Sequence, residues 1–270
     1  MKNVRFHYTY PLNINIPTNK NVNVYIDRIH DLSISKVYPG NVKILILEEP
    51  KKGNSFEFAK RNKHKYTHLL TFHEELLRTN EKARLFHCTN SWVAGYVPEQ
   101  KKFSVSTVVG GKVDAAMEGY AVRHDVWNSR ELITIPKDFY LSSNFKLAGV
   151  DYNNEKVLGS SKTPLFDSMF HISIENTSIK NYFSEKIVDC FQTKTVPIYY
   201  GCKNIGDYFN IDGILVANNV QEIIEICNLL TPEVYQTMLP AMEDNLQRSM
   251  KWLDHDEQIK NAVVQILNEK

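Results

Sequence analysis

The sequence lacks the marks of several protein classes. Its 270 residues contain no internal repeat and no low-complexity segment, with 43% hydrophobic and 23% charged residues. No apolar run approaches the roughly 18–20 residues that a membrane-spanning helix needs. No hydrophobic segment of signal-peptide type follows the first residues. These absences argue against a disordered, collagen-like or integral membrane protein, and we expect a cytoplasmic protein.

The excess of one charge sign is also small, and cysteines are few. The chain has 32 Lys and Arg against 31 Asp and Glu, which gives a formal net charge of +1. Proteins that bind nucleic acid through its phosphates carry a basic excess or a basic face, so we expect no nucleic-acid partner. The four cysteines show no CxxC spacing, which predicts reduced and mostly buried thiols rather than disulfides or a zinc framework.

Short apolar runs alternate with amphipathic stretches, which is typical of α/β proteins with parallel sheets. The expected strands cover residues 42–47, 66–71, 84–88, 103–109, 165–174, 196–200 and 214–216. The expected helices cover 52–64, 73–78, 120–131, 185–192 and most of the chain from residue 220. The first 40 residues show no clear pattern. Pro98 and polar neighbours interrupt the pattern, so we predict domains at 1–98 and 99–250 and a C-terminal helix at 251–270 that packs back on the first domain.

The most informative stretch covers residues 170–201. A strand there ends at Glu175 and Asn176, and a polar loop follows. Ser184 then stands where a helix N-cap is expected, with Lys186 in the first turn. A helix N-terminus presents free N–H groups and a partial positive charge, and Lys186 adds a full charge. From spacing alone, an anion site and an ordinary capped surface helix remain equally open.

This stretch resembles the donor-binding signature of the α-1,3-fucosyltransferases, glycosyltransferase family 10. The residues that match the family pattern are Phe170, Glu175, Asn176, Tyr182, Ser184, Glu185, Lys186, Val196, Pro197, Ile198 and Gly201. So many fixed offsets make the signal specific, and the similarity covers about residues 103–210. The resemblance implies a GT-B fold, with two Rossmann-like domains facing across a cleft. The N-terminal, acceptor-side domain is reduced, and the C-terminal domain holds the GDP-sugar.

The resemblance also implies roles for four residues of the signature. Asn176 and Tyr182 would line the nucleotide pocket. Glu185 would face hydroxyls of the sugar or the ribose, and Lys186 would face the pyrophosphate.

A second group of candidates follows the Val-rich strand. Gly110 and Gly111 allow the backbone to approach a phosphate closely, and Lys112 comes next. The family has an essential arginine downstream of this strand. Arg123, whose guanidinium can bind two phosphate oxygens, is the best match. Arg130 competes for this role, and Lys112 is the weaker donor-binding candidate.

Glycosyl transfer leaves negative charge on the departing nucleotide, which a metal ion or fixed cations must stabilise. The only Asp-x-Asp motif is Asp254-His255-Asp256, in a stretch with a helical pattern. Residues at i and i+2 do not share a helix face, so we reject it as a metal site. Arg123, Lys186 and the helix start at Ser184 can replace the metal, and we expect no metal or other cofactor to be required.

An inverting transfer also needs a carboxylate that takes the proton of the acceptor hydroxyl. The pairs Glu48-Glu49 and Glu74-Glu75 each follow an expected strand. The context of Glu74 resembles the family more closely, so we favour Glu74, with Glu75 and Glu49 behind it. Each is equally well explained as a carboxylate at a helix start.

The resemblance therefore implies transfer of L-fucose from GDP-fucose to a hydroxyl of an oligosaccharide or glycoconjugate. Two alternatives are a transferase for another GDP-sugar, such as GDP-mannose, and a catalytically silent protein that binds sugar nucleotides.

Overall fold

A computed structural model describes residues 2–27, 41–50 and 55–269. The chain forms two compact units. The first comprises Met1–Thr89, Lys180–Tyr182 and Asp254–Lys270, and the second comprises Asn90–Ile179 and Phe183–Leu253. Within the described ranges, no helix has both the length and the apolar character needed to cross a membrane.

The first unit contains a five-stranded parallel sheet in the order β2-β4-β5-β6-β7. Its strands are β2 (Arg5–His7), β4 (Val22–Ile26), β5 (Val42–Ile46), β6 (His68–Thr71) and β7 (Ala83–Leu85). A separate antiparallel pair joins β1 (Lys2–Asn3) to β3 (Pro17–Thr18). The strands predicted in residues 42–88 are confirmed, with β7 ending earlier than expected, whereas β2 and β4 lie in the part that showed no clear pattern.

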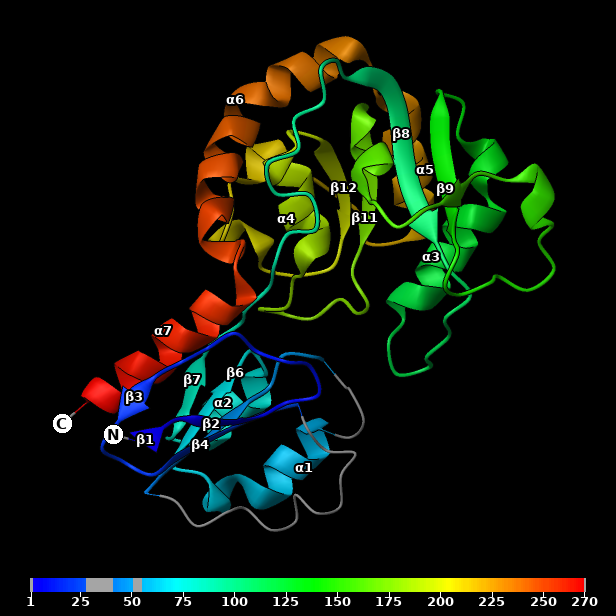
Figure 1. The fold of residues 1–270 in the computed structure, drawn as a ribbon. Coiled ribbons are helices and arrows are strands. Elements are labelled where there is room, and N and C mark those ends of the chain that lie inside the picture. Colours follow the sequence, from blue (N-terminus) through cyan, green and yellow to red (C-terminus); the bar gives the residue numbers. More distant parts are fainter. Residues whose placement is uncertain (1, 28–40, 51–54, 270) are drawn as a thin grey trace. The chain divides into compact units, whose positions relative to one another are not determined.

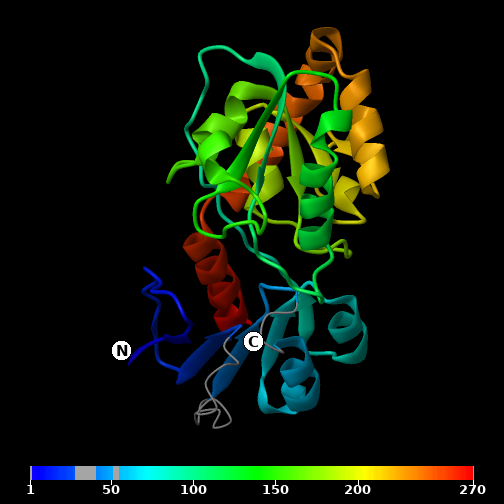
Figure 2. The same ribbon diagram turned by 90° about the vertical axis from the view of Figure 1, so that its right-hand side faces the viewer.

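Helices cover both faces of this sheet (Figure 2). Side chains alternate along a strand, so Ile44 and Ile46 of β5 pack in one cluster and Leu45 in another. The first cluster includes buried residues of α7 (His255–Asn268). The second includes residues of α1 (Ser55–Asn62) and α2 (Glu74–Thr79). The central strands are therefore apolar on both sides.

The second unit contains a six-stranded parallel sheet in the order β10-β9-β8-β11-β12-β13. Its strands are β8 (Lys102–Val109), β9 (Lys137–Ser142), β10 (Val157–Leu158), β11 (Ser168–Ile174), β12 (Val196–Tyr200) and β13 (Leu215–Val216). From β8 the chain moves outward to β9 and β10. It then returns to β11 beside β8 and continues outward on the other side. The direction of winding therefore reverses between β8 and β11.

Four α-helices pack with this sheet (Figure 1): α3 (Gly119–Asn128), α4 (Glu185–Gln192), α5 (Val220–Leu229) and α6 (Pro232–Ser249). The bounds predicted for α4 and β12 are confirmed. The strand expected from residue 165 begins at Ser168 instead, because a 3₁₀ turn containing Pro164 precedes it. The 3₁₀ turns of the described chain are η3 (Lys63–Lys65), η4 (Arg130–Leu132), η5 (Tyr152–Asn154), η6 (Thr163–Asp167), η7 (Ile205–Asp207), η8 (Ile211–Gly213) and η9 (Met250–Trp252).

Candidate functional site

The carboxyl ends of β8 and β11 form the winding reversal of the second sheet. In open α/β sheets, ligands bind at such a reversal, because the loops that leave the two strands part in opposite directions. Gly110 follows β8, and Glu175 and Asn176 follow β11. The glycines and the Glu-Asn pair singled out in the sequence therefore flank one edge of the sheet.

Arg123 of α3 lies at the end of β11. Its guanidinium donates to the Ile174 carbonyl, with Nε at 3.1 Å, and Nη2 donates to Oδ1 of Asn176 at 2.9 Å. The next residue, His124, contacts the Gly110 carbonyl through Nε2 at 2.8 Å. Two predicted donor residues, Arg123 and Asn176, are thus in direct contact, and the helix that carries Arg123 also reaches the end of β8.

The competing arginine and the weaker lysine have different surroundings. Arg130 stacks on Trp127, with Cζ 4.5 Å from the ring centroid, and its Nη2 lies 3.2 Å from Glu155. Lys112 is exposed, and its Nζ lies 5.0 Å from the ring centroid of Tyr120. The Arg123 guanidinium lies at the same distance from that ring. Lys112 and Arg123 therefore share one aromatic neighbour, whereas Arg130 contacts other partners.

The start of α4 is tied to the end of β11 through Glu175, whose side chain is fully buried. The Ser184 backbone N–H donates to Oε1 of Glu175 at 2.8 Å, and the Ser184 hydroxyl donates to Oε2 at 2.6 Å. Lys186 Nζ lies 3.6 Å from the same carboxylate. Burial raises the pKa of Glu175, and Lys186 and Ser184 partly oppose this rise. Glu175 thus positions the helix start that carries Lys186.

Glu185 stays ionised between two lysines. Its Oε1 lies 3.3 Å from Lys162 Nζ and 3.4 Å from Lys186 Nζ. Burial would raise the pKa of Glu185, but Lys186 and Lys162 together with Ser184 lower it to about 2. The predicted donor residues Glu185 and Lys186 are therefore an ion pair in the structure.

Tyr182 belongs to the short segment that clusters with the first unit. It is buried, and its ring centroid lies 5.3 Å from that of Phe72. Tyr182 is therefore a packed aromatic residue of the first unit.

The predicted bases Glu74 and Glu75 are the first two residues of α2. The Glu74 side chain is 60% exposed and lies 3.1 Å from Lys180 Nζ, and Glu75 lies 2.7 Å from Lys60 Nζ. The third candidate, Glu49, donates its backbone N–H to the carboxylate of Asp27 at 2.7 Å. Both members of the Glu74-Glu75 pair thus sit in exposed ion pairs at a helix N-terminus.

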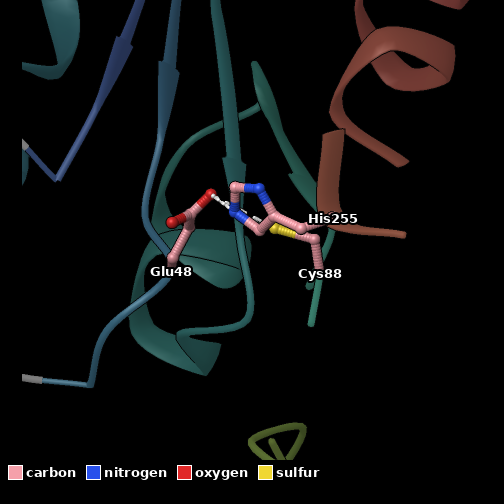
Figure 3. A group of neighbouring side chains, drawn as sticks. All are labelled: Glu48, Cys88 and His255. Atoms are coloured by element: carbon pink, nitrogen blue, oxygen red, sulfur yellow. Dashed lines mark hydrogen bonds and ion pairs between the residues drawn. The ribbon is translucent and has the colours of Figure 1, made fainter. Parts of the chain in front are cut away.

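Glu48, which was not favoured as a base from the sequence, contacts several polar side chains in the first unit. Its side chain is 10% exposed. It accepts from the Tyr8 hydroxyl at 2.8 Å. It also accepts from the Cys88 thiol at 3.2 Å and lies 2.9 Å from His255 Nε2 (Figure 3). We call Glu48, Cys88 and His255 the Glu48 cluster.

The pKa values in and around the Glu48 cluster reflect burial and the carboxylate charge. Burial and Glu48 raise the pKa of Cys88, and the same two causes raise that of Tyr8. Burial would lower the pKa of His255, but Glu48 and Asp256 raise it above its ordinary value.

All four cysteines are free thiols, and three of them are buried, as predicted.

No protein-family model matches the sequence, and no curated protein matches it. Solved structures do match. One is a crystal structure of an α1,3-fucosyltransferase with GDP-fucose, with a TM-score of 0.56 and 16% identity over 93% of this chain and 80% of that one. A structure described simply as an α1,3-fucosyltransferase has a TM-score of 0.58, 15% identity and the same coverage.

The pneumococcal O-GlcNAc transferase GtfA, in complex with UDP and GlcNAc, is similar at a TM-score of 0.54 and 12% identity, over 92% of this chain and 57% of that one. The two units, each with a parallel sheet, agree with these likenesses. The predicted α/β architecture is confirmed: the chain has the GT-B fold of these glycosyltransferase structures.

Proposed function

We propose that the protein is an inverting glycosyltransferase that transfers L-fucose from GDP-fucose to a hydroxyl of an oligosaccharide or glycoconjugate. One observation carries this proposal: Arg123 contacts Asn176 where the winding of the second sheet reverses. The start of α4, which is held by Glu175, also follows β11 there. The likeness in fold to an α1,3-fucosyltransferase structure with GDP-fucose supports the choice of donor.

In this proposal, fixed cations take the place of a metal ion at the donor. Arg123 contributes its fixed positive charge at the pyrophosphate, and Lys186 adds charge at the N–H groups of the α4 start. These groups stabilise the charge that develops on the leaving GDP. Asn176 lines the nucleotide pocket, Glu185 accepts from sugar or ribose hydroxyls, and Lys112 is a further phosphate contact.

Nucleotide titration tests the donor first. Calorimetry with GDP, UDP and CMP is expected to show preference for GDP, and the affinity should be the same with and without EDTA. Arg123→Ala is expected to weaken GDP binding at least about tenfold, because a charged hydrogen bond to phosphate contributes about 1.5–3 kcal/mol. Arg130→Ala is the matched control and should keep the affinity. Equal binding of all three nucleotides would overturn the donor assignment.

Donor hydrolysis separates the alternatives. GDP-fucose is expected to be hydrolysed faster than GDP-mannose, and the reverse order would favour the transferase for another GDP-sugar. GDP binding without hydrolysis or transfer of either donor would support the silent sugar-nucleotide-binding protein.

For the acceptor, we propose that Glu74 acts as the base. Glu74→Gln is expected to lose transfer by at least about 100-fold, the usual contribution of a general base, while GDP affinity stays unchanged. Glu81→Gln, in an exposed turn of the same unit, is the control. Full activity of Glu74→Gln would move the assignment to Glu75 or Glu49.

A further inference from the structure

Three side chains with metal-binding atoms converge in the Glu48 cluster. Glu48 follows β5, Cys88 follows β7, and His255 is the first residue of α7. One ligand atom from each lies within 4.8 Å of the others, and the side chains point toward one another (Figure 3). The donor-binding residues of the second unit do not include any of them, so the proposed reaction gives this cluster no role.

The types of donor atom indicate which ion would bind. Thiolate and imidazole favour Zn²⁺, whereas Mg²⁺, Mn²⁺ and Ca²⁺ prefer oxygen ligands. His255 Nε2 and Cys88 Sγ lie 2.9 and 3.2 Å from Glu48 Oε1. Ligands of one tetrahedral Zn²⁺ lie roughly 3.3–3.6 Å apart. The two distances to Glu48 Oε1 are therefore within about half an ångström of the spacing in a zinc site, and the third, between Nε2 and Sγ, is no more than 4.8 Å.

The residues behind these ligands are arranged as in metal sites. His255 Nδ1 lies 3.2 Å from Oδ1 of Asp256, which leaves Nε2 directed at Glu48. A carboxylate on the far ring nitrogen fixes the tautomer that can bind a metal. The Tyr8 hydroxyl donates to Oε2 of Glu48, so Oε1 is the oxygen that faces the other two ligands. The Asp27 carboxylate also accepts the Glu48 backbone N–H at 3.1 Å.

We propose that Glu48, Cys88 and His255 bind one Zn²⁺ ion in the first unit. Water would fill the fourth position, as is usual for zinc with three protein ligands. The bound ion would link the start of α7 to the ends of two strands of the sheet. The proposal rests on the geometry of the first unit and is independent of the proposed donor and reaction.

The test uses the full chain, stripped with a chelator and dialysed. Addition of Zn²⁺ is expected to give one ion per chain and a higher melting temperature. Addition of Co²⁺ is expected to give tetrahedral visible bands and a thiolate charge-transfer band. Cys88→Ser should lose the charge-transfer band, and His255→Ala should weaken metal binding at least about tenfold. Cys202→Ser in the second unit and the exposed His64→Ala are the matched controls.

Asp256→Asn tests the site without removing a ligand. The carboxylate also accepts the Asn13 backbone N–H at Oδ2, 2.7 Å away. An asparagine that keeps this bond turns its amide NH₂ toward His255 Nδ1, which forces the proton onto Nε2, the atom that should bind the ion. Zn²⁺ affinity should fall about 10–100-fold while the thiolate band persists at saturating Co²⁺.

Several results would overturn the proposal. They are no uptake of either ion by the wild-type chain, a charge-transfer band that survives Cys88→Ser, or equal affinity in wild type and His255→Ala. Such results would identify the cluster as a hydrogen-bonded network or the uptake as adventitious. GDP titration of the same samples keeps the two proposals apart, because the donor residues lie in the second unit.

Discussion

Lys186 offers the sharpest test of the electrostatics at the start of α4. Its Nζ lies 3.6 Å from the buried carboxylate of Glu175, 3.4 Å from Glu185 and 3.0 Å from the Ser184 hydroxyl. The lysine side chain is 23% exposed, so water screens these contacts only in part. Lys186→Met keeps most of the aliphatic chain and removes the charge, which leaves two neighbouring carboxylates with one fewer cation.

The expected loss follows from the pKa of Glu185. Lys186 is the largest of the interactions that lower this pKa from 4.5 to about 2, ahead of Lys162. The whole difference corresponds to roughly 3 kcal/mol at neutral pH, and Lys186 makes the largest charge–charge contribution to it. Glu175 also loses its cation, and breaking a buried pair costs about 3–5 kcal/mol. We therefore expect Lys186→Met to lower the free energy of unfolding by about 3 kcal/mol at pH 7.5.

The destabilisation by Lys186→Met should depend on pH. Because the folded pKa of Glu185 lies below the unfolded value, its stabilising contribution is complete above pH 4.5 and is lost as pH falls toward 2. The destabilisation by Lys186→Met should therefore be largest at neutral pH and smaller at pH 4. Urea unfolding followed by circular dichroism at pH 7.5, 5.5 and 4.0 measures it.

Lys162→Met is the matched control, because Lys162 Nζ contacts Glu185 and has a 31% exposed side chain. The loss of unfolding free energy in Lys162→Met should be smaller than in Lys186→Met and should also decrease as the pH falls. A loss below about 0.5 kcal/mol for Lys186→Met at pH 7.5, within the range of ordinary surface substitutions, would refute the reasoning. So would a loss that stays constant with pH.

Three further predictions concern stability. Burial lowers the pKa of Lys101 to about 7, so the folded state releases the Lys101 proton between pH 7 and 9 while the unfolded state keeps it. Over this range the free energy of unfolding of the wild type, measured by calorimetry, should rise by about 2.5 kcal/mol relative to that of Lys101→Met. Burial raises the pKa of Asp189 to about 6. An asparagine there can still accept from Ser91 and Trp92, so Asp189→Asn should raise the free energy of unfolding at pH 8 by about 2 kcal/mol, measured by urea unfolding. This advantage should fall to about half at pH 5 and vanish as the pH falls below 3.8. Ile259→Ala in α7 should cost about 3 kcal/mol in urea unfolding, because the side chain is fully buried in the first unit, and a cost under 1 kcal/mol would contradict its place in the core.

The elements predicted best are those whose signals are local. Helix α4 begins where Ser184 caps it, and an amphipathic pattern continues for eight residues, so its bounds agree with the prediction. Strand β4 (Val22–Ile26) escaped prediction because Asn23 interrupts its apolar run. Asn23 is fully buried, with Oδ1 3.1 Å from Nε2 of His7 in β2. A buried polar side chain whose oxygen is bonded to the neighbouring strand is read as a loop residue from the sequence alone.

The candidate sites follow the same division. Glu175, Ser184 and Lys186 lie within twelve residues of a strand–loop–helix unit, so chain geometry alone brings them together. Glu48 and His255 are 207 positions apart, and only the return of α7 to the first sheet makes them neighbours. The two aspartates of Asp254-His255-Asp256 have other partners in the structure. Asp254 caps α7, and Asp256 accepts from Asn13.

Helix-face spacing compares only residues of the same helix, so it gives no information about His255. The partners of His255 come from strand ends that are distant in the sequence and lie near the start of α7. That start brings His255 Nε2 to 2.9 Å from a carboxylate beside a thiol, and Asp256 of the rejected motif then fixes the ring. A search for ligand spacing along the chain finds sites built within one element, whereas a site built from three separated segments becomes visible only in the folded chain.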